Sequence, residues 1–266
     1  LDVCNAAQVQ AVFDAVKPEL VINAAAYTAV DKAESEIERA YAVNADGVGF
    51  LAATAEKLGI ALLHISTDYV FSGEHDRPYT PDDVTQPTGV YGFSKLAGEH
   101  QLALYCSRHI VLRTSWVFGA HGNNFVKTML RLGAERDSLS VVDDQRGGPT
   151  SAGSIADTLW SLAAIFQREG KLEWGVYHFS GQPACTWYDF ARAIFIQAVS
   201  LGLLEKSPDV QAISTASYPT SAKRPTWSVL DCTKLTQTHG LPHSHWEDEL
   251  VRVLHQLSGR STAENA

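Results

Sequence analysis

The first half of the chain alternates short apolar runs with longer stretches of helical periodicity. Apolar runs at residues 19–26, 60–71 and 109–118 predict buried strands. Between and around them, the pattern predicts helices over residues 7–16, 31–58 and 90–105; the second is expected to break near Asn44 and to end at Gly59. Strands that alternate with helices predict a parallel sheet with crossover helices on its faces.

After Gly119 the predicted elements become shorter and mixed. Helices are expected at residues 123–132, 154–168, 187–199 and 245–257, and strands at 139–142 and 176–180. We therefore expect an α/β protein with a parallel-sheet domain over residues 1–150 and a smaller mixed α/β lobe over 151–258, to which 119–150 contributes. A cleft between the two is the expected ligand site. Residues 259–266 are predicted to be a disordered tail.

The composition narrows the possible functions. The 266 residues are 45% hydrophobic and 19% charged, which is typical of a globular protein with its own core. Because 21 Lys and Arg stand against 30 Asp and Glu, the formal net charge of -9 disfavours nucleic acid as the main partner. The four cysteines are scattered without metal-binding spacing, and no apolar stretch reaches the ~18 residues of a membrane span. We expect a cytoplasmic protein that does not bind membranes.

Tyr91 and Lys95 are the first candidates for chemistry. They lie four residues apart on a predicted helix, so that their side chains share one face. A Lys ammonium beside the phenol is expected to lower the Tyr pKa from ~10 toward neutrality, which suits a general acid. The spacing alone also fits a half-buried Tyr and a solvated Lys. Residues 66–71, however, end the preceding strand at the sheet edge where α/β proteins bind ligands, and they offer a hydroxyl beside Tyr91.

Several longer strings carry a resemblance to a known family. They are NAAAYTAVDKAE at 23–34, STDYVF at 66–71, VYGFSKLAGE at 90–99, RTSWV at 113–117, GNNF at 122–125, DQRGGPT at 144–150 and RP at 224–225. In this order they resemble the extended short-chain dehydrogenase/reductases, and within these the dTDP-4-dehydrorhamnose reductases, over nearly the whole chain. The resemblance implies a Rossmann-like NAD(P)-binding domain over 1–150 and a substrate-binding lobe over 151–258. It also implies that NADPH or NADH reduces the C4 keto group of dTDP-4-dehydro-L-rhamnose to give dTDP-L-rhamnose.

The resemblance further implies a role for each matching residue. Tyr91 would protonate the C4 oxygen as hydride reaches C4, while Lys95 would hold the nicotinamide ribose and Thr67 would lie beside the sugar. The implied cofactor contacts are Asp2, Val3, Ala26, Tyr27, Thr28, Ile65, Tyr91 and Lys95. The implied substrate contacts are Thr67, Asp68, Trp116, Asn123, Asn124 and Arg224, the last because guanidinium pairs well with diphosphate oxygens. Magnesium dependence and a homodimer follow from the resemblance only, since no carboxylate cluster or His motif predicts a metal site.

Alternatives remain open at this point. Another nucleotide-sugar reductase or epimerase shares the Tyr/Lys pair, and a non-catalytic regulatory subunit can share the fold; Thr67, Tyr91 and Lys95 together count against the latter. Without the resemblance, Trp116 also fits core packing and Asp68 also fits a turn or helix cap. Hydrolysis is disfavoured because no serine lies in a GxSxG elbow.

The sequence departs from the family in one respect. No GxGxxG or GxxGxxG follows a strand near the start, although such a turn at a helix N-terminus binds the dinucleotide pyrophosphate. By the family's proportions the first strand–helix–strand unit would precede Leu1. We therefore expect this chain alone to bind NADPH weakly, and we expect the residues that choose between NADH and NADPH to lie in that unit.

Overall fold

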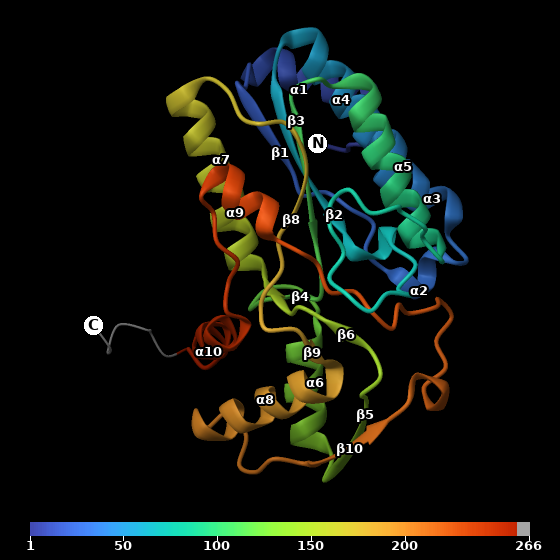
Figure 1. The fold of residues 1–266 in the computed structure, drawn as a ribbon, viewed down its shortest axis with the longest axis vertical. Helices are drawn as coiled ribbons and strands as arrows, with labels where there is room; N and C mark the ends of the chain where they lie inside the picture. Colours follow the sequence, from blue (N-terminus) through green and yellow to red (C-terminus); the bar gives the residue numbers. More distant parts are fainter. Residues whose placement is uncertain (260–266) are drawn as a thin grey trace.

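The computed structural model describes residues 1–259 and contains a central four-stranded sheet (Figure 1). The strand order is β1 (Leu20–Asn23), β2 (Ala61–Thr67), β3 (His109–Thr114) and β8 (Gly175–His178). All neighbouring pairs are parallel. β2 and β3 lie in the middle and are buried almost throughout, which explains why they read as near-continuous apolar runs.

Helices that the sequence predicts cover one face of this sheet. They are α1 (Ala6–Val16), α4 (Gly47–Leu58) and α5 (Val90–Tyr105). Their apolar residues pack in one core with Leu62 of β2 and Val111 of β3. Burial of each such side chain stabilises the fold by about 1.5–3 kcal/mol.

The opposite face is covered by α7 (Ala152–Glu169) and α9 (Thr233–His239). Because successive strand residues point to opposite faces, Leu63 and Leu112 belong to this second core, next to Leu62 and Val111 in the chain but not in space. The result is a three-layer α/β unit, as the sequence predicts. The sequence predicts that the sheet domain ends at residue 150. However, α7, β8 and α9 follow that residue and still belong to this unit, so the chain crosses between the two lobes.

The long helical pattern of residues 31–58 is broken near Asn44, as predicted. It contains α2 (Val30–Ala33), α3 (Ile37–Tyr41) and a π-helical segment, Ala42–Asp46, that leads directly into α4. Asn44 is fully buried in the π-helical segment. Such segments are frequently found at functional sites.

A second lobe lies below the carboxyl ends of the main strands in Figure 1. It is built from α6 (Phe125–Glu135), α8 (Trp187–Ser200) and α10 (Trp246–Leu257), which share one apolar core. Its strands form three short pairs: β5 (Ser138–Val142) with β10 (Asp209–Ile213), β4 (Val117–Phe118) with β7 (Thr150–Ser151), and β6 (Arg146–Gly147) with β9 (Cys185–Thr186). The carboxyl ends of β2 and β3 therefore face a lobe with its own apolar core.

The three strands predicted in the first half of the chain end earlier than the apolar pattern suggests. β2 stops at Thr67, whose hydroxyl accepts a hydrogen bond from the Tyr69 amide at 3.2 Å and opens a 3-10 turn, Asp68–Val70. The predicted strand 109–118 divides into β3 and β4 because Trp116 has a left-handed backbone, with φ 48°. β1 likewise ends at Asn23 rather than at residue 26, and the sequence did not predict α9 or β10.

Two further observations complete the fold. Within residues 1–259, no helix is long and apolar enough to cross a membrane. The predicted disordered tail, 259–266, lies outside the described residues except for Gly259.

Candidate active site

Two glycines let α5 pack closely against the turn that follows β2 and against the π-helical segment. A Cβ at Gly92 would lie 2.3 Å from the backbone oxygen of Tyr69, and one at Gly98 would lie 2.0 Å from that of Asn44. Only glycine permits such an approach. Tyr91 and Lys95 are thereby fixed beside the turn that follows β2, as their shared helix face predicts.

Tyr91, Thr67 and Asp68 form a hydrogen-bonded group. The Thr67 side chain is hydrogen-bonded to the Tyr91 phenol, and its hydroxyl donates to Asp68 Oδ1 at 3.0 Å. Burial raises the pKa of Tyr91 well above its usual value, and the charge of Asp68 raises it further, whereas the Thr67 hydrogen bond lowers it. The phenol is therefore protonated at neutral pH, which is the form that a general acid requires.

The predicted lowering of the Tyr91 pKa by Lys95 is wrong for this structure. The Lys95 side chain is only 2% exposed, and its Nζ donates to the Ile65 carbonyl at 2.7 Å and lies 3.2 Å from His64 Nε2. Its nitrogen is thus tied to the sheet, and burial lowers the pKa of Lys95 to about 8, against the opposing charge of Glu99. The alternative of a solvated Lys95 is also wrong.

Asp68 is a buried carboxyl group. Burial raises the pKa of Asp68 to about 6, although hydrogen bonds from Thr67 and Ser228 act in the opposite direction. A buried carboxylate is costly, so a hydroxyl of a bound ligand would be a favourable further partner. Asp68 also begins the 3-10 turn, so the structure combines the turn-forming alternative with a position beside Tyr91.

Arg224 reaches this group from the segment after β10. Its Nη2 pairs with Asp31 Oδ2 at 2.5 Å, and its Nη1 donates to the Tyr69 hydroxyl at 3.1 Å. The Tyr69 ring in turn lies edge-on to Tyr91, with centroids 5.4 Å apart. Residues from both halves of the sequence therefore meet beside the candidate acid.

The remaining predicted substrate residues lie where β3 passes into the second lobe. Trp116 stacks on Trp187 of α8, with ring centroids 3.6 Å apart and planes 7° apart. Asn124 caps α6: its Oδ1 accepts from the Lys127 amide at 3.3 Å and its Nδ2 donates to the Gly119 carbonyl at 2.7 Å. Asn123 is exposed at the same turn. Trp187 was not predicted as a site residue, because its contact with a residue far away in the chain leaves no local sequence signal.

The chain as a whole is similar to proteins of known sequence and structure. Residues 1–258 match the family model described as the RmlD substrate binding domain. The chain belongs to this family. It is similar to the dTDP-4-dehydrorhamnose reductases of Aggregatibacter actinomycetemcomitans (49% identical over 253 residues, 95% of this chain and 86% of that protein) and of Escherichia coli K12 (42% over 242 residues, 91% and 81%).

A solved structure of the same family supports the fold. The dTDP-4-dehydrorhamnose reductase of Bacillus anthracis, crystallised in complex with NADP, is 36% identical; the match covers 96% of this chain and 87% of that one, with a TM-score of 0.88. The predicted Rossmann-like fold and the predicted family are therefore confirmed.

The loop after β1, which contains the predicted cofactor contacts Ala26, Tyr27 and Thr28, is held in place by Asn44. Its Tyr27 amide donates to Asn44 Oδ1 at 2.8 Å, while Asn44 Nδ2 donates to the Tyr27 carbonyl and to Ser94 Oγ, both at 3.0 Å. This clamp ties the loop containing Ala26 and Thr28 to α5. Asn44 was not predicted as a site residue, although a polar residue at a break in a helical pattern was a signal.

The donor groups present fit the nicotinamide ribose of NAD(P). Lys95 Nζ donates one N–H to the Ile65 carbonyl and can donate a further hydrogen bond to a ligand. The loop held by Asn44 adds backbone groups at the carboxyl end of β1. Asp2 and Val3, the predicted adenine contacts, precede α1; Asp2 Oδ1 accepts from the Cys4 amide at 3.0 Å and Val3 packs against the core around α1 and α4. Among residues 1–259 no three His, Cys, Asp or Glu side chains gather as a metal site requires.

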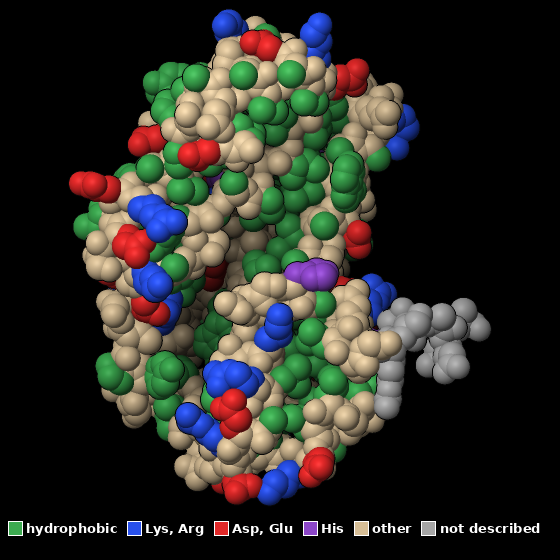
Figure 2. Space-filling model, turned by 180° about the vertical axis from the view of Figure 1, so that it is seen from behind, with side chains coloured by type: hydrophobic (Ala, Val, Ile, Leu, Met, Phe, Trp, Pro, Cys, Tyr) green, Lys and Arg blue, Asp and Glu red, His purple; other side chains and the backbone are tan. Residues whose placement is uncertain are grey.

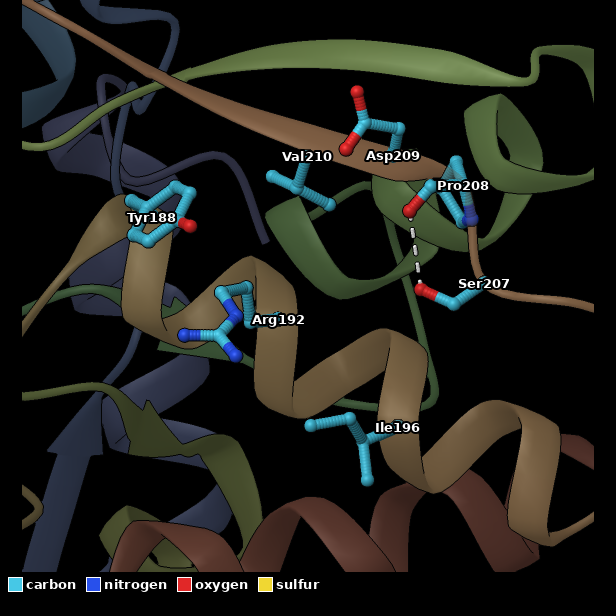
Figure 3. Close-up of a pocket in the computed structure, with 7 residues that line it drawn as sticks. All are labelled: Tyr188, Arg192, Ile196, Ser207, Pro208, Asp209 and Val210. Carbon is cyan, nitrogen blue, oxygen red and sulfur yellow. Dashed lines mark hydrogen bonds between the residues drawn. The ribbon is translucent and has the colours of Figure 1, made fainter.

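The two lobes leave a hollow on the face opposite to that of Figure 1, with Lys and Arg side chains on both sides of it (Figure 2). A separate surface pocket of about 380 Å³ lies on the second lobe (Figure 3). It is lined by Tyr188, Arg192 and Ile196 of α8 and by Ser207, Pro208, Asp209 and Val210 at the start of β10. None of these is a predicted site residue, so this pocket is distinct from the Tyr91 site.

Proposed function

We propose that this protein reduces the C4 keto group of dTDP-4-dehydro-L-rhamnose to the alcohol of dTDP-L-rhamnose, with NADPH or NADH as the hydride donor. The observation that carries the proposal is the protonated phenol of Tyr91, hydrogen-bonded to Thr67 at the carboxyl end of β2 and four residues from the buried Lys95 on the same helix. The names of the relatives at 42–49% identity support this reductase rather than an epimerase or a regulatory subunit.

The chemistry requires one hydride and one proton. A bound NAD(P)H supplies the hydride to C4. Tyr91 donates its phenolic proton to the oxygen on which negative charge develops, and Thr67, fixed through Asp68, orients the phenol and the sugar oxygen. The ketone thus becomes an alcohol, and Tyr91 is left as a phenolate. Because its surroundings disfavour the charged form, it regains a proton from solvent at neutral pH.

The predicted site residues fall into two groups, one for each ligand. We assign Asp2, Val3, Ala26, Tyr27, Thr28, Ile65, Tyr91 and Lys95 to the cofactor, and Thr67, Asp68, Trp116, Asn123, Asn124 and Arg224 to the nucleotide sugar. Arg224 suits the diphosphate because a guanidinium ion pairs with two oxyanions at once. Asn124 acts through the cap of α6, which holds the adjacent Asn123 in place. A cytoplasmic location and a homodimer stay predictions.

The test is a panel of sugar nucleotides with C4-deuterated NADPH and NADH. We expect oxidation of the cofactor with dTDP-4-dehydro-L-rhamnose, and deuterium at C4 of the sugar product by NMR. Turnover only with another nucleotide sugar would transfer the assignment to a related reductase. Isomerisation without net cofactor oxidation would indicate an epimerase, and no turnover with any member of the panel would favour a non-catalytic role.

A further inference from the structure

The segment of residues 222–227, which leads from β10 toward α9, packs on the loop that follows β2. The Thr226 hydroxyl and the Trp227 amide both donate to the Gly73 carbonyl, at 2.8 and 3.1 Å. A Cβ at Gly73 would lie 2.4 Å from Pro225 Cβ, so a side chain has no space between the two. The segment is therefore held in place by tertiary contacts along its length.

Asp31, in the first turn of α2, uses both carboxylate oxygens on this segment. Its Oδ1 accepts the Ala222 amide at 3.1 Å, and its Oδ2 pairs with Arg224 Nη2 at 2.5 Å. The two bonded residues are 191 and 193 positions away in the chain. The mechanism above gives no role to Asp31.

The guanidinium group of Arg224 is also held from a second side. Its Nη1 donates to the Tyr69 hydroxyl at 3.1 Å, and burial raises the pKa of Tyr69 to about 12, so this hydroxyl is a neutral acceptor. A guanidinium group has five N–H donors. Within residues 1–259, only the bonds to Asp31 and Tyr69 use these donors, and the side chain is 21% exposed. The remaining donors are available to an anion.

These free donors lie about one ring away from the proposed acid. The Tyr69 ring, which contacts Arg224 through its hydroxyl, lies edge-on to Tyr91 with centroids 5.4 Å apart. In a nucleotide sugar, the diphosphate is attached to C1, which lies opposite C4 across the sugar ring. A sugar whose C4 oxygen meets Tyr91 therefore places its β-phosphate at a span that matches Arg224.

We propose that Asp31 is a positioning residue that orients Arg224 toward the β-phosphate of the nucleotide sugar, the phosphate attached to C1. This inference rests on the proposed function. Orientation matters because a guanidinium group binds phosphate through two parallel N–H donors of one plane. The Asp31 carboxylate also opposes the phosphate charge, but it is 44% exposed, so that water and salt screen this repulsion.

The deciding variant is Asp31→Asn, which keeps the shape of the side chain. An amide has one accepting oxygen and one donating nitrogen, so it cannot accept from both Ala222 and Arg224 as the carboxylate does. Glu74→Gln is the matched control. Glu74 pairs with Lys223 of the same segment at 3.3 Å, and the substitution removes the same charge without touching Arg224.

Calorimetric titration of the full chain with dTDP and with dTMP, which lacks the β-phosphate, tests the proposal. We expect Asp31→Asn to raise the Kd for dTDP about tenfold and to leave the Kd for dTMP within about twofold, while Glu74→Gln should change neither. In an Arg224→Met background, Asp31→Asn should cause no further loss of dTDP affinity. A role limited to docking the segment would instead give losses that add.

Unchanged or tighter binding of dTDP by Asp31→Asn would overturn the proposal, because Asp31 would then be neutral or would compete with the phosphate for Arg224. Equal losses for dTDP and dTMP would also overturn it, since they would indicate a general change in the site. Failure of the unmodified protein to bind dTDP would overturn both proposals. A protein that shows the expected dTDP binding but reduces no nucleotide sugar would contradict the proposed function alone and leave the role of Asp31 intact.

Discussion

The buried ion pair beneath α5 gives the sharpest stability prediction. Glu99 receives Arg113 Nη2 at 2.6 Å and Nε at 3.0 Å, together with the Ser66 hydroxyl at 2.5 Å. Both charged side chains are 5% exposed. Glu99→Gln keeps the shape of the side chain but leaves the guanidinium buried without a counter-ion.

The expected loss is large because the remaining charge stays away from water. Breaking a buried ion pair by removing one partner costs about 3–5 kcal/mol. For a chain of this size, each kcal/mol lowers Tm by roughly 2–4 °C, so Glu99→Gln should lower Tm by roughly 6–20 °C.

The assay is thermal unfolding by circular dichroism beside a matched surface variant. Glu135→Gln removes the same charge from a surface i,i+4 pair with Arg131. The Arg131 and Glu135 side chains are 61% and 52% exposed, so this variant should lose only about 0.3–0.5 kcal/mol of stability. Replacing both partners, as Glu99→Leu with Arg113→Met, should recover much of the loss, since no buried charge remains unpaired. If Glu99→Gln and Glu135→Gln have the same Tm, the argument from burial is refuted.

Three further predictions concern the surroundings of the site. Gly98→Ala should destabilise by about 1–3 kcal/mol in chemical denaturation, because its Cβ has no space, whereas Gly153→Ala in α7 meets only ordinary contacts at 3.7 Å and should not destabilise. The pKa of Asp68 in the folded protein is raised to about 6, so its protonated carboxyl stabilises the fold fully below pH ~4, and this stabilisation is lost as the pH rises through 6. An asparagine at this position would not titrate, so Asp68→Asn should raise the unfolding free energy at pH 8 by up to roughly 3 kcal/mol more than it does at pH 4. Trp187→Leu should raise KM for the nucleotide sugar more than it lowers kcat, because Trp116 loses its stacking partner; an unchanged KM would contradict that role.

Local patterns predicted the elements that position the acid. Helix α5 begins and ends at the predicted residues, and its Tyr91/Lys95 spacing placed both groups at the end of β2. The alternation of strands and helices predicted the parallel sheet, because crossover helices force neighbouring strands into one direction.

The environment of these groups could not be predicted from local patterns. Asn23 and His64 are 41 residues apart and meet only through the register of β1 and β2, which depends on tertiary pairing. Two glycines let α5 pack closely against the turn after β2 and the π-helical segment, and Lys95 is buried; its lowered pKa follows from this packing and not from its spacing to Tyr91. The stacking of Trp116 on Trp187 likewise depends on tertiary packing.

The central claim is that Tyr91 provides the proton for reduction of the sugar ketone. Its most direct test is the kcat of NADPH oxidation with dTDP-4-dehydro-L-rhamnose for the unmodified protein and for Tyr91→Phe, with circular dichroism to show that both are folded. Removing a general acid should lower kcat by about 10²–10⁴-fold, with little change in the affinity for the nucleotide sugar. Turnover by Tyr91→Phe within about twofold of the unmodified protein, against the range expected for such an acid, would contradict the account.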